Sequence, residues 1–264
     1  MFGKALTGTS FTTQDGQEVR LAGVMSAGDD GQAATPAGGA AAREALENAL
    51  RGGTVTLAAT DAPDRYGRVV AQVFAGSTWV QAQLVSSGLL RSFPDHASAP
   101  CARHLIDAED HARAGEAGHW RDGAFALRTP ELLRNRVGTF QLVEGEVTTA
   151  STKNGRAYIN FGADYKTDFT VTVEPDDLKL FRQARFDVKK LAGKHVRVRG
   201  WVELYNGPEM VVSTPAAIQI LDEPAPPTVD STKIADVTKT ANAEKPSKEQ
   251  PKTAKKKRTR KKKT

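Results

Sequence analysis

The stretch DRYGRVVAQVF, residues 64–74, is the segment that says most about the fold. Its polar first part belongs to a predicted turn over Asp61–Gly67, and its apolar second part, Val69–Phe74, predicts a strand. The segment before the turn, Thr54–Ala59, is rich in apolar and β-branched residues and predicts a second strand. We therefore expect two strands that flank a polar turn.

Short strands and three helices are predicted around these two strands. Residues 25–39 are rich in Gly and Ala and predict a loop, and Gly52 and Gly53 mark the end of the first helix. Glu and Arg residues four positions apart support that helix. The predicted strands are Lys4–Thr13 and Glu18–Val24, and the predicted helices are Pro36–Arg51, Val80–Ser87 and about 102–115.

A second segment, from Thr139 to Leu221, has its own order of elements. One helix, Asp176–Ala184, is predicted between two groups of strands, and Asn206-Gly207 predicts a hairpin turn. Three strands, a helix and two or three further strands are the order of an OB-type barrel. The predicted strands are Phe140–Thr149, Ala157–Phe161, Phe169–Val173, His195–Leu204, Glu209–Ser213 and Ala217–Leu221.

Positive charge is concentrated at the end of the chain. From residue 230 onward there are 13 Lys/Arg and 4 Asp/Glu, a net charge of +9, so the remaining residues carry −3 of the total of +6. This tail lacks aromatic and periodic apolar residues, which predicts disorder. A flexible polycation binds polyanions, and nucleic acid is the expected partner, with an acidic protein, an anionic lipid or mere solubility as alternatives. Its terminal cations are Lys252, Lys255, Lys256, Lys257, Arg258, Arg260, Lys261, Lys262 and Lys263.

Several classes of protein are excluded by composition. No run of about 18 apolar residues exists, which excludes a membrane-spanning helix. Nucleic acid rather than a membrane is the expected partner. The first residues lack the apolar run of a secretory signal, which predicts a cytoplasmic protein. The single cysteine, Cys101, excludes an intramolecular disulfide framework and a metal cluster built on cysteines.

The first 121 residues resemble the staphylococcal-nuclease-like (thermonuclease) family. Three blocks carry the resemblance: VRLAGV at 19–24, DRYGR at 64–68 before an apolar strand, and GHW at 118–120 after the last helix. The resemblance implies a five-stranded OB-type barrel with three helices. It also implies cleavage of phosphodiester bonds in DNA or RNA, typically with calcium.

The two arginines of the family's site are present as Arg20 and Arg68. The resemblance implies that both bind the phosphate, and the planar fork of arginine can donate two parallel hydrogen bonds to phosphate oxygens. In the family, a calcium ion held by carboxylates neutralises the phosphate while water attacks. The resemblance therefore predicts a phosphate-binding site at these two positions.

The carboxylates of the family's site are replaced. Thr9 and Met25 stand at the positions of the two metal-binding aspartates, and Gly28 stands at the position of the catalytic glutamate. A thioether is a poor ligand for calcium, and a neutral hydroxyl does not balance the charge of the ion. Loss of the general base alone forfeits a rate factor of about 10²–10⁴. The expectation is a domain without metal-dependent cleavage and without a cofactor.

Alternatives stay open at this site. Asp29 or Asp30 could supply a carboxylate from a shifted loop, which would allow a calcium-dependent nuclease with Arg20 and Arg68, but a solvated loop is the preferred interpretation of both aspartates. Without a metal, the two arginines could equally form salt bridges within the protein. Tyr66 could stack on a base or fix the turn.

The second barrel has its own candidate face. Alternation along the strands places Arg197, Arg199 and Trp201 outward, together with Tyr158 from another strand. Such side chains could stack bases and follow a single-stranded backbone. The alternative is that Trp201 packs against the linker or the first domain.

Together these observations predict a mainly β protein with some helices (α+β). Two OB-type five-stranded barrels in tandem are expected, at residues 1–121 and 139–221, with a linker at 122–138 and a disordered basic tail at 222–264. The expected function is nucleic-acid binding, to DNA or RNA, without metal-dependent cleavage. An active phosphodiesterase and a protein-binding scaffold are the alternatives.

Overall fold

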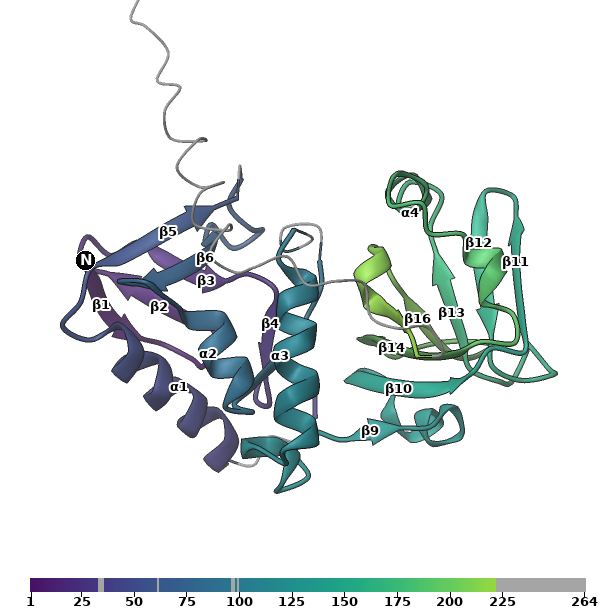
Figure 1. Cartoon of the computed structure of the whole chain (residues 1–264), viewed down its shortest axis with the longest axis horizontal. Helices are drawn as coiled ribbons and strands as arrows, with labels where there is room; N and C mark the ends of the chain where they lie inside the picture. Colours follow the sequence, from purple (N-terminus) through teal and green to yellow (C-terminus); the bar gives the residue numbers. More distant parts are fainter. Residues whose placement is uncertain (33–35, 61, 96–97, 99, 222–264) are drawn as a thin grey trace, which may run out of the picture. The chain divides into compact units, whose positions relative to one another are not determined.

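A curled sheet organises the first half of the chain in the computed structural model (Figure 1). The structure describes residues 1–32, 36–60, 62–95, 98 and 100–221, so the predicted tail lies outside the described residues. The strand order is β1-β2-β3-β6-β5, and β7 pairs with β6. The strands are β1 (Phe2–Ala5), β2 (Ser10–Thr13), β3 (Glu18–Leu21), β5 (Val55–Ala59), β6 (Val69–Ala75) and β7 (Thr78–Trp79).

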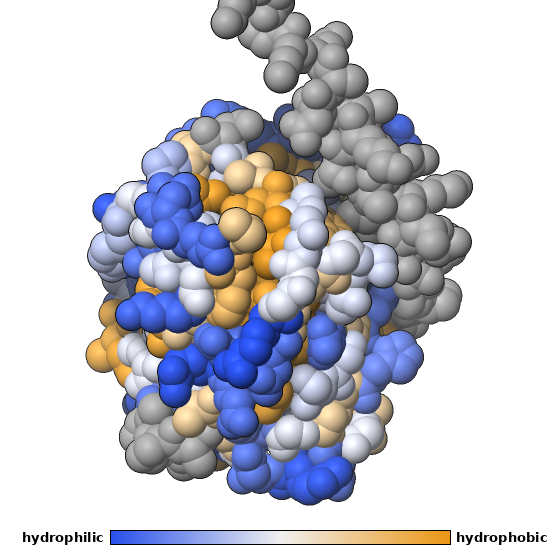
Figure 2. All heavy atoms as spheres, turned by 90° about the vertical axis from the view of Figure 1, so that its left-hand side faces the viewer, coloured by the Kyte–Doolittle hydropathy of each residue, from blue (hydrophilic) through white to orange (hydrophobic). Residues whose placement is uncertain are grey.

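The alternation of side chains explains how this sheet forms a core. Val19 and Leu21 on β3 are fully buried, while Arg20 between them points the other way. β5 is the last strand of the sheet, and its side chains are only partly buried. Figure 2, which views this side of the first half, accordingly shows apolar and hydrophilic residues together on the surface.

Three helices complete the first half, close to their predicted bounds. They are α1 (Pro36–Leu50), α2 (Val80–Ser86) and α3 (Ala102–Ala114). Leu46 of α1, Leu84 of α2 and Leu105 of α3 belong to the same buried cluster as the sheet residues. A short 3-10 turn, η1 (Gly118–Trp120), follows α3. No helix in the described part of the chain has both the length and the apolar character needed to cross a membrane.

A small second sheet of the first half brings two distant segments together. β4 (Val24–Ser26) pairs antiparallel with β8 (Leu90–Ser92), and Met25 lies opposite Arg91. Both strands are buried. This pairing fixes the strand that leads into the loop that carries Asp29 and Asp30.

The second half contains two further sheets with a common buried core. Their orders are β11-β12-β13-β16-β15 and β17-β14-β10-β9. Ile159, Val171, Val198 and Met210 are fully buried in this core. The elements are β10 (Phe140–Glu146), β11 (Thr149–Lys153), β12 (Arg156–Asn160), β13 (Thr170–Val173), α4 (Leu178–Gln183), η3 (Val188–Leu191), β14 (His195–Trp201), β15 (Glu203–Tyr205), β16 (Gly207–Val211), η4 (Pro215–Ala217) and β17 (Ile218–Ile220).

The segment predicted as a linker, residues 122–138, contains two short elements that were not predicted. β9 (Leu127–Arg128) pairs parallel with β10, and η2 (Pro130–Arg136) follows it. Leu133 is fully buried in the core of the second half. Sequence reasoning missed this because a two-residue strand and a 3-10 turn have no periodic pattern.

The predicted fold class is confirmed: the protein is mainly β with some helices, and its sheets are curled. All described residues lie in one compact unit, Met1–Thr228. The presence of two closed five-stranded barrels stays a prediction, as do the domain boundaries.

Candidate functional site

A cavity of about 600 Å³ lies where the turn at 64–68 meets β3 and β4. Arg20 and Arg68, which the family resemblance assigned to phosphate, both line it. So do Thr9 and Met25, which the resemblance assigned to the positions of the family's metal ligands. The complete lining is Thr7, Thr9, Arg20, Val24, Met25, Asp29, Asp64, Arg65, Tyr66, Arg68, Phe93 and Trp201.

The two arginines differ in how firmly they are held. The Arg68 Nε and one terminal nitrogen both lie 2.8 Å from Asp64 Oδ2, and Glu18 lies 3.8 Å from the other terminal nitrogen. Arg20, in contrast, makes no ion pair or side-chain hydrogen bond with any described residue. The salt-bridge interpretation therefore holds for Arg68, while the guanidinium of Arg20 is available to an anion.

Asp64 anchors the turn as well as Arg68. Its Oδ1 accepts the backbone N–H groups of Tyr66 and Arg68 at 2.9 and 3.0 Å. Burial by itself raises the pKa of Asp64, but the hydrogen bonds from the backbone of Arg68, from its side chain and from Tyr66 lower that pKa overall. Asp64 is thus an ionised carboxylate that is hydrogen-bonded within its own turn.

Asp29 and Asp30 have opposite environments. Asp29 is exposed and lines the cavity, where its Oδ2 accepts the hydroxyls of Thr9 and Ser26 at 2.8 and 2.7 Å. Asp30 is 1% exposed, and its Oδ2 lies 2.5 Å from Arg91. The solvated-loop interpretation is wrong for Asp30, and it missed that Asp29 is held at the cavity.

The side chains of the cavity do not fit a calcium ion. Calcium takes six to eight oxygen ligands and is usually held by several carboxylates. Among the described lining residues, Asp29 is the one carboxylate without an ion pair, because Asp64 is paired with Arg68. Met25 offers sulfur and Gly28 has no side chain. Within the described residues, no three His, Cys, Asp or Glu side chains are grouped so that they could hold a metal.

Aromatic side chains form a further part of the cavity wall. Tyr66 is 66% exposed, and the guanidinium carbons of Arg65 and Arg68 lie 4.8 and 5.1 Å from its ring centre. Phe93 follows β8, and Trp201 ends β14 in the second half. A cavity with a free guanidinium, hydroxyls and several ring faces can accept a phosphate and a planar group together.

Buried charges attach the second half to the first and place Trp201 at this cavity. A terminal nitrogen of Arg91 bridges Asp30 Oδ2 and the backbone carbonyl of Phe140, at 2.5 and 3.0 Å. The Phe140 N–H donates to the Asp30 carbonyl at 2.8 Å. Burial lowers the pKa of Arg91 to about 10, although Asp30 and Glu109 act in the opposite direction. Arg91 is therefore still charged at neutral pH.

A second group of buried charges joins α3 to β14. Arg199 donates to Glu109 Oε1 at 2.8 Å and also to Gln219, and both ion-pair partners are at most 2% exposed. Arg197 lies between Asp110 and Glu144, at 2.8 and 2.9 Å. Both arginines point out of the second core, as predicted, but they are buried against α3. The prediction that they lie on an accessible face is therefore wrong.

Tyr158 and Trp201, the other residues of the face predicted on the second half, do not lie at one site. Tyr158 lies on the outer side of β12, where Arg156 stands 5.7 Å from its ring centre, and it does not line the cavity. Trp201 lies at the cavity of the first half, which agrees with the alternative that it packs against the first domain. The terminal cations from Lys252 to Lys263 lie outside the described residues.

Sequence reasoning missed Glu109 and Asp110. The buried stripe of α3 consists of Ala102, Leu105, Ile106, Glu109 and Ala112. A carboxylate in a stripe of apolar residues was the available signal, because a buried charge needs a partner. The partner itself is 90 residues away in the chain, and no local pattern gives its position.

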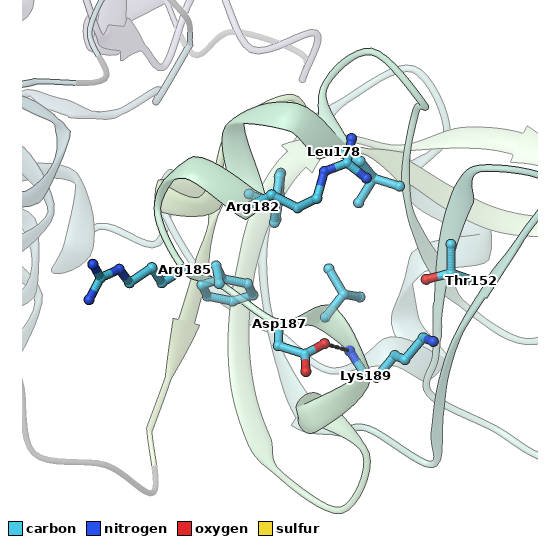
Figure 3. A pocket seen from close by; sticks show the side chains of 9 residues that line it. Thr152, Leu178, Arg182, Arg185, Asp187 and Lys189 are labelled. Carbon is cyan, nitrogen blue, oxygen red and sulfur yellow. Dashed lines mark hydrogen bonds between the residues drawn. The ribbon is translucent and has the colours of Figure 1, made fainter.

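A second hollow, of about 450 Å³, lies between α4, η3 and β11 (Figure 3). Its floor is apolar, with Phe181 and Phe186 in edge-to-face contact at 5.5 Å. Arg182 and Lys189 lie at its edges, while the side chain of Arg185 extends away from it (Figure 3). Asp187 caps η3 by accepting the Lys189 N–H at 3.1 Å. Nothing in the sequence pattern had pointed to this hollow.

A curled, OB-like half-barrel sheet is the arrangement of the thermonuclease class, and here it carries an arginine-lined cavity at the turn after β5. Comparison with known families agrees, since residues 18–122 match the family model described as Staphylococcal nuclease homologue. This part of the chain is thus an SNase domain, and the family consists mostly of calcium-dependent nucleases. No curated protein matches the chain.

Proposed function

We propose that this protein binds nucleic acid through the cavity of its SNase domain and does not cleave it with a metal ion. The single observation that carries the proposal is the guanidinium of Arg20, which lines the cavity and has no side-chain partner among the described residues. Thr9 and Met25, which the resemblance assigns to the metal-ligand positions, line the same cavity. The SNase family match supports a nucleic-acid ligand.

The proposed binding mode follows from the donors of the cavity. Arg20 donates two parallel hydrogen bonds to a backbone phosphate, and the Thr7 hydroxyl is a further polar group of the wall. Arg68 contributes positive charge while Asp64 keeps it in place. Asp29 disfavours a close second anion, which limits the cavity to one phosphate. DNA and RNA share this phosphate, so both are expected ligands.

The test measures the affinity for a labelled single-stranded oligonucleotide by fluorescence anisotropy. Arg20→Ala is expected to weaken binding by about 10-fold or more, because a charge-assisted hydrogen bond contributes about 1.5–3 kcal/mol. Arg51→Ala is the matched control, since Arg51 is exposed directly after α1, and Glu47 is its one ion-pair partner among the described residues. Binding is expected to be equal with calcium and with a chelator. Equal affinities of Arg20→Ala and Arg51→Ala would contradict the proposal.

The position of Asp29 favours one second candidate, a phosphodiesterase. Asp29 lines the same cavity as Arg20 and Arg68, whereas Asp30 is buried against Arg91. One oxygen of Asp29 is held by two hydroxyls, and the other could accept a proton from an attacking water. Strand cleavage by the purified protein that Asp29→Asn and Arg68→Ala each abolish would establish this activity in place of simple binding.

A further inference from the structure

We infer that Trp201, supplied by the second half of the chain, is a base-stacking residue of the SNase-domain cavity, so that the two halves form one nucleic-acid site. The inference rests on the proposed function and adds to it a residue that lies outside the matched SNase region, residues 18–122. It also specifies the ligand as a strand with an unpaired base.

The position of Trp201 is the first observation. It ends β14 and is half-buried, and it lines the cavity together with Arg20 and Tyr66. Its ring meets that of Phe140 edge to face at 6.2 Å. A Cβ built on Gly31 would lie 3.0 Å from Cζ3 of Trp201, and Gly31 has a φ of +72° that favours glycine. The indole is thus supported on one side by Phe140 and the loop after Asp30.

The fixed position of the strand that carries Trp201 is the second observation. Phe140 is held by Arg91 and Asp30, and Arg199, two residues before Trp201, is held by Glu109. These partners are buried, so the strand that carries Trp201 cannot shift without uncovering charges. A ring fixed before the ligand arrives loses little conformational entropy on binding.

The chemistry of the wall then specifies the ligand. Arg20 provides the place for a phosphate, and Trp201 provides a ring face for a base of the same strand. A base in a duplex is stacked on its neighbours and cannot present its face. The volume of about 600 Å³ falls within the range of about 300–1,000 Å³ typical of ligand sites.

The test compares two strands of equal length, an oligothymidylate and a fully abasic oligodeoxyribose phosphate. Affinities are measured on the full-length protein at raised salt, which screens the charge of the tail. Trp201→Ala is expected to weaken binding of oligothymidylate by about 10-fold and to leave binding of the abasic strand unchanged, because stacking on an aromatic residue contributes about 1–3 kcal/mol per base. Trp201→Phe is expected to restore most of the affinity.

Two controls distinguish a base-stacking role of Trp201 from a purely structural role. Tyr205→Ala removes an aromatic ring that is 67% exposed on β15 and does not line the cavity, and it is expected to change neither affinity. Equal weakening of both strands by Trp201→Ala would assign Trp201 a structural role and overturn the inference. If Arg20→Ala weakens binding but Trp201→Ala does not, the inference fails and the proposed function stands. If neither variant weakens binding, the proposed function fails as well.

Discussion

Arg20 and Arg68 show how one residue type serves two purposes in one cavity. Asp64 holds Arg68 through its side chain and the turn through two backbone N–H groups, so this arginine is part of the structure. Arg20 sits on β3 between two buried residues, and the strand alone fixes its position. The distinction matters because Arg68 would have to weaken its ion pair with Asp64 to bind an anion. Arg20 has no ion pair with any described residue to lose.

Asp64→Asn is predicted to lower stability at neutral pH, and the difference from the wild type is predicted to disappear in acid. The pKa of Asp64 is lowered in the folded protein, so its ionised form contributes stability above the unfolded pKa of about 3.9. That contribution is lost as the pH falls through the folded pKa. Because the pair is partly solvated, we expect a loss of up to about 1 kcal/mol at pH 7.

Urea unfolding of both proteins between pH 7 and pH 2 measures this difference. A gap in the free energy of unfolding that narrows below pH 4 agrees with a charge effect. A gap of constant size down to pH 2 would show that the asparagine disturbs the turn by its shape, and would sink the prediction.

At the scale of elements, α3 has two functions. Its apolar residues pack against α2 and β8, and Glu109 and Asp110 bind the arginines of β14. The Glu109 carboxylate also accepts the Ser92 N–H of β8 at 2.6 Å. One side chain of α3 therefore connects the small β4–β8 sheet with the second half of the chain.

Arg199→Met is predicted to destabilise the protein by about 3–5 kcal/mol, because it leaves the Glu109 carboxylate buried without its cation. Adding Glu109→Gln is predicted to recover most of that loss. The amide is neutral, and its oxygen can still accept the Ser92 N–H. Urea unfolding of the two single variants and the double variant gives the coupling energy directly.

Arg197→Met provides the comparison for this cycle. Its partners Asp110 and Glu144 keep side-chain exposures of 30% and 27%, so water can solvate them once the arginine is gone. A smaller loss, of about 1 kcal/mol, is expected. If Arg197→Met and Arg199→Met lower the free energy of unfolding equally, burial of the partner carboxylate does not determine the loss of stability.

At the scale of the whole molecule, the sequence carries a strongly basic tail beyond the described residues. Its nine terminal cations follow a body of opposite net charge. If all nine contact duplex phosphates, the logarithm of the binding constant is predicted to fall with the logarithm of salt concentration at a slope of about −8. Deletion of residues 250–264 is predicted to remove most of this slope. A slope that the deletion leaves unchanged would eliminate the tail as a binding element.

Local patterns predicted the helices and most of the strands, but they did not predict the short strands β4, β8 and β9 or the contacts between distant elements. The helices at 36–50, 80–86 and 102–114 follow from apolar periodicity and glycine stops, and the turn at 64–68 follows from its polar residues. The arginines of the cavity followed from the resemblance. In contrast, the partners of Arg91 and Arg199 are 61 and 90 residues away, so the burial of these arginines depends on tertiary packing.

The ion pairs between α3 and β14, Glu109 with Arg199 and Asp110 with Arg197, have a practical consequence for the design of truncated fragments. A fragment that ends at residue 122, where the family match ends, would present Glu109 and Asp110 to water without Arg199 and Arg197. Its freshly uncovered side would be acidic and would repel the polyanion that the neighbouring cavity is proposed to bind. Activity measured on such a truncated piece would understate what the intact polypeptide can do.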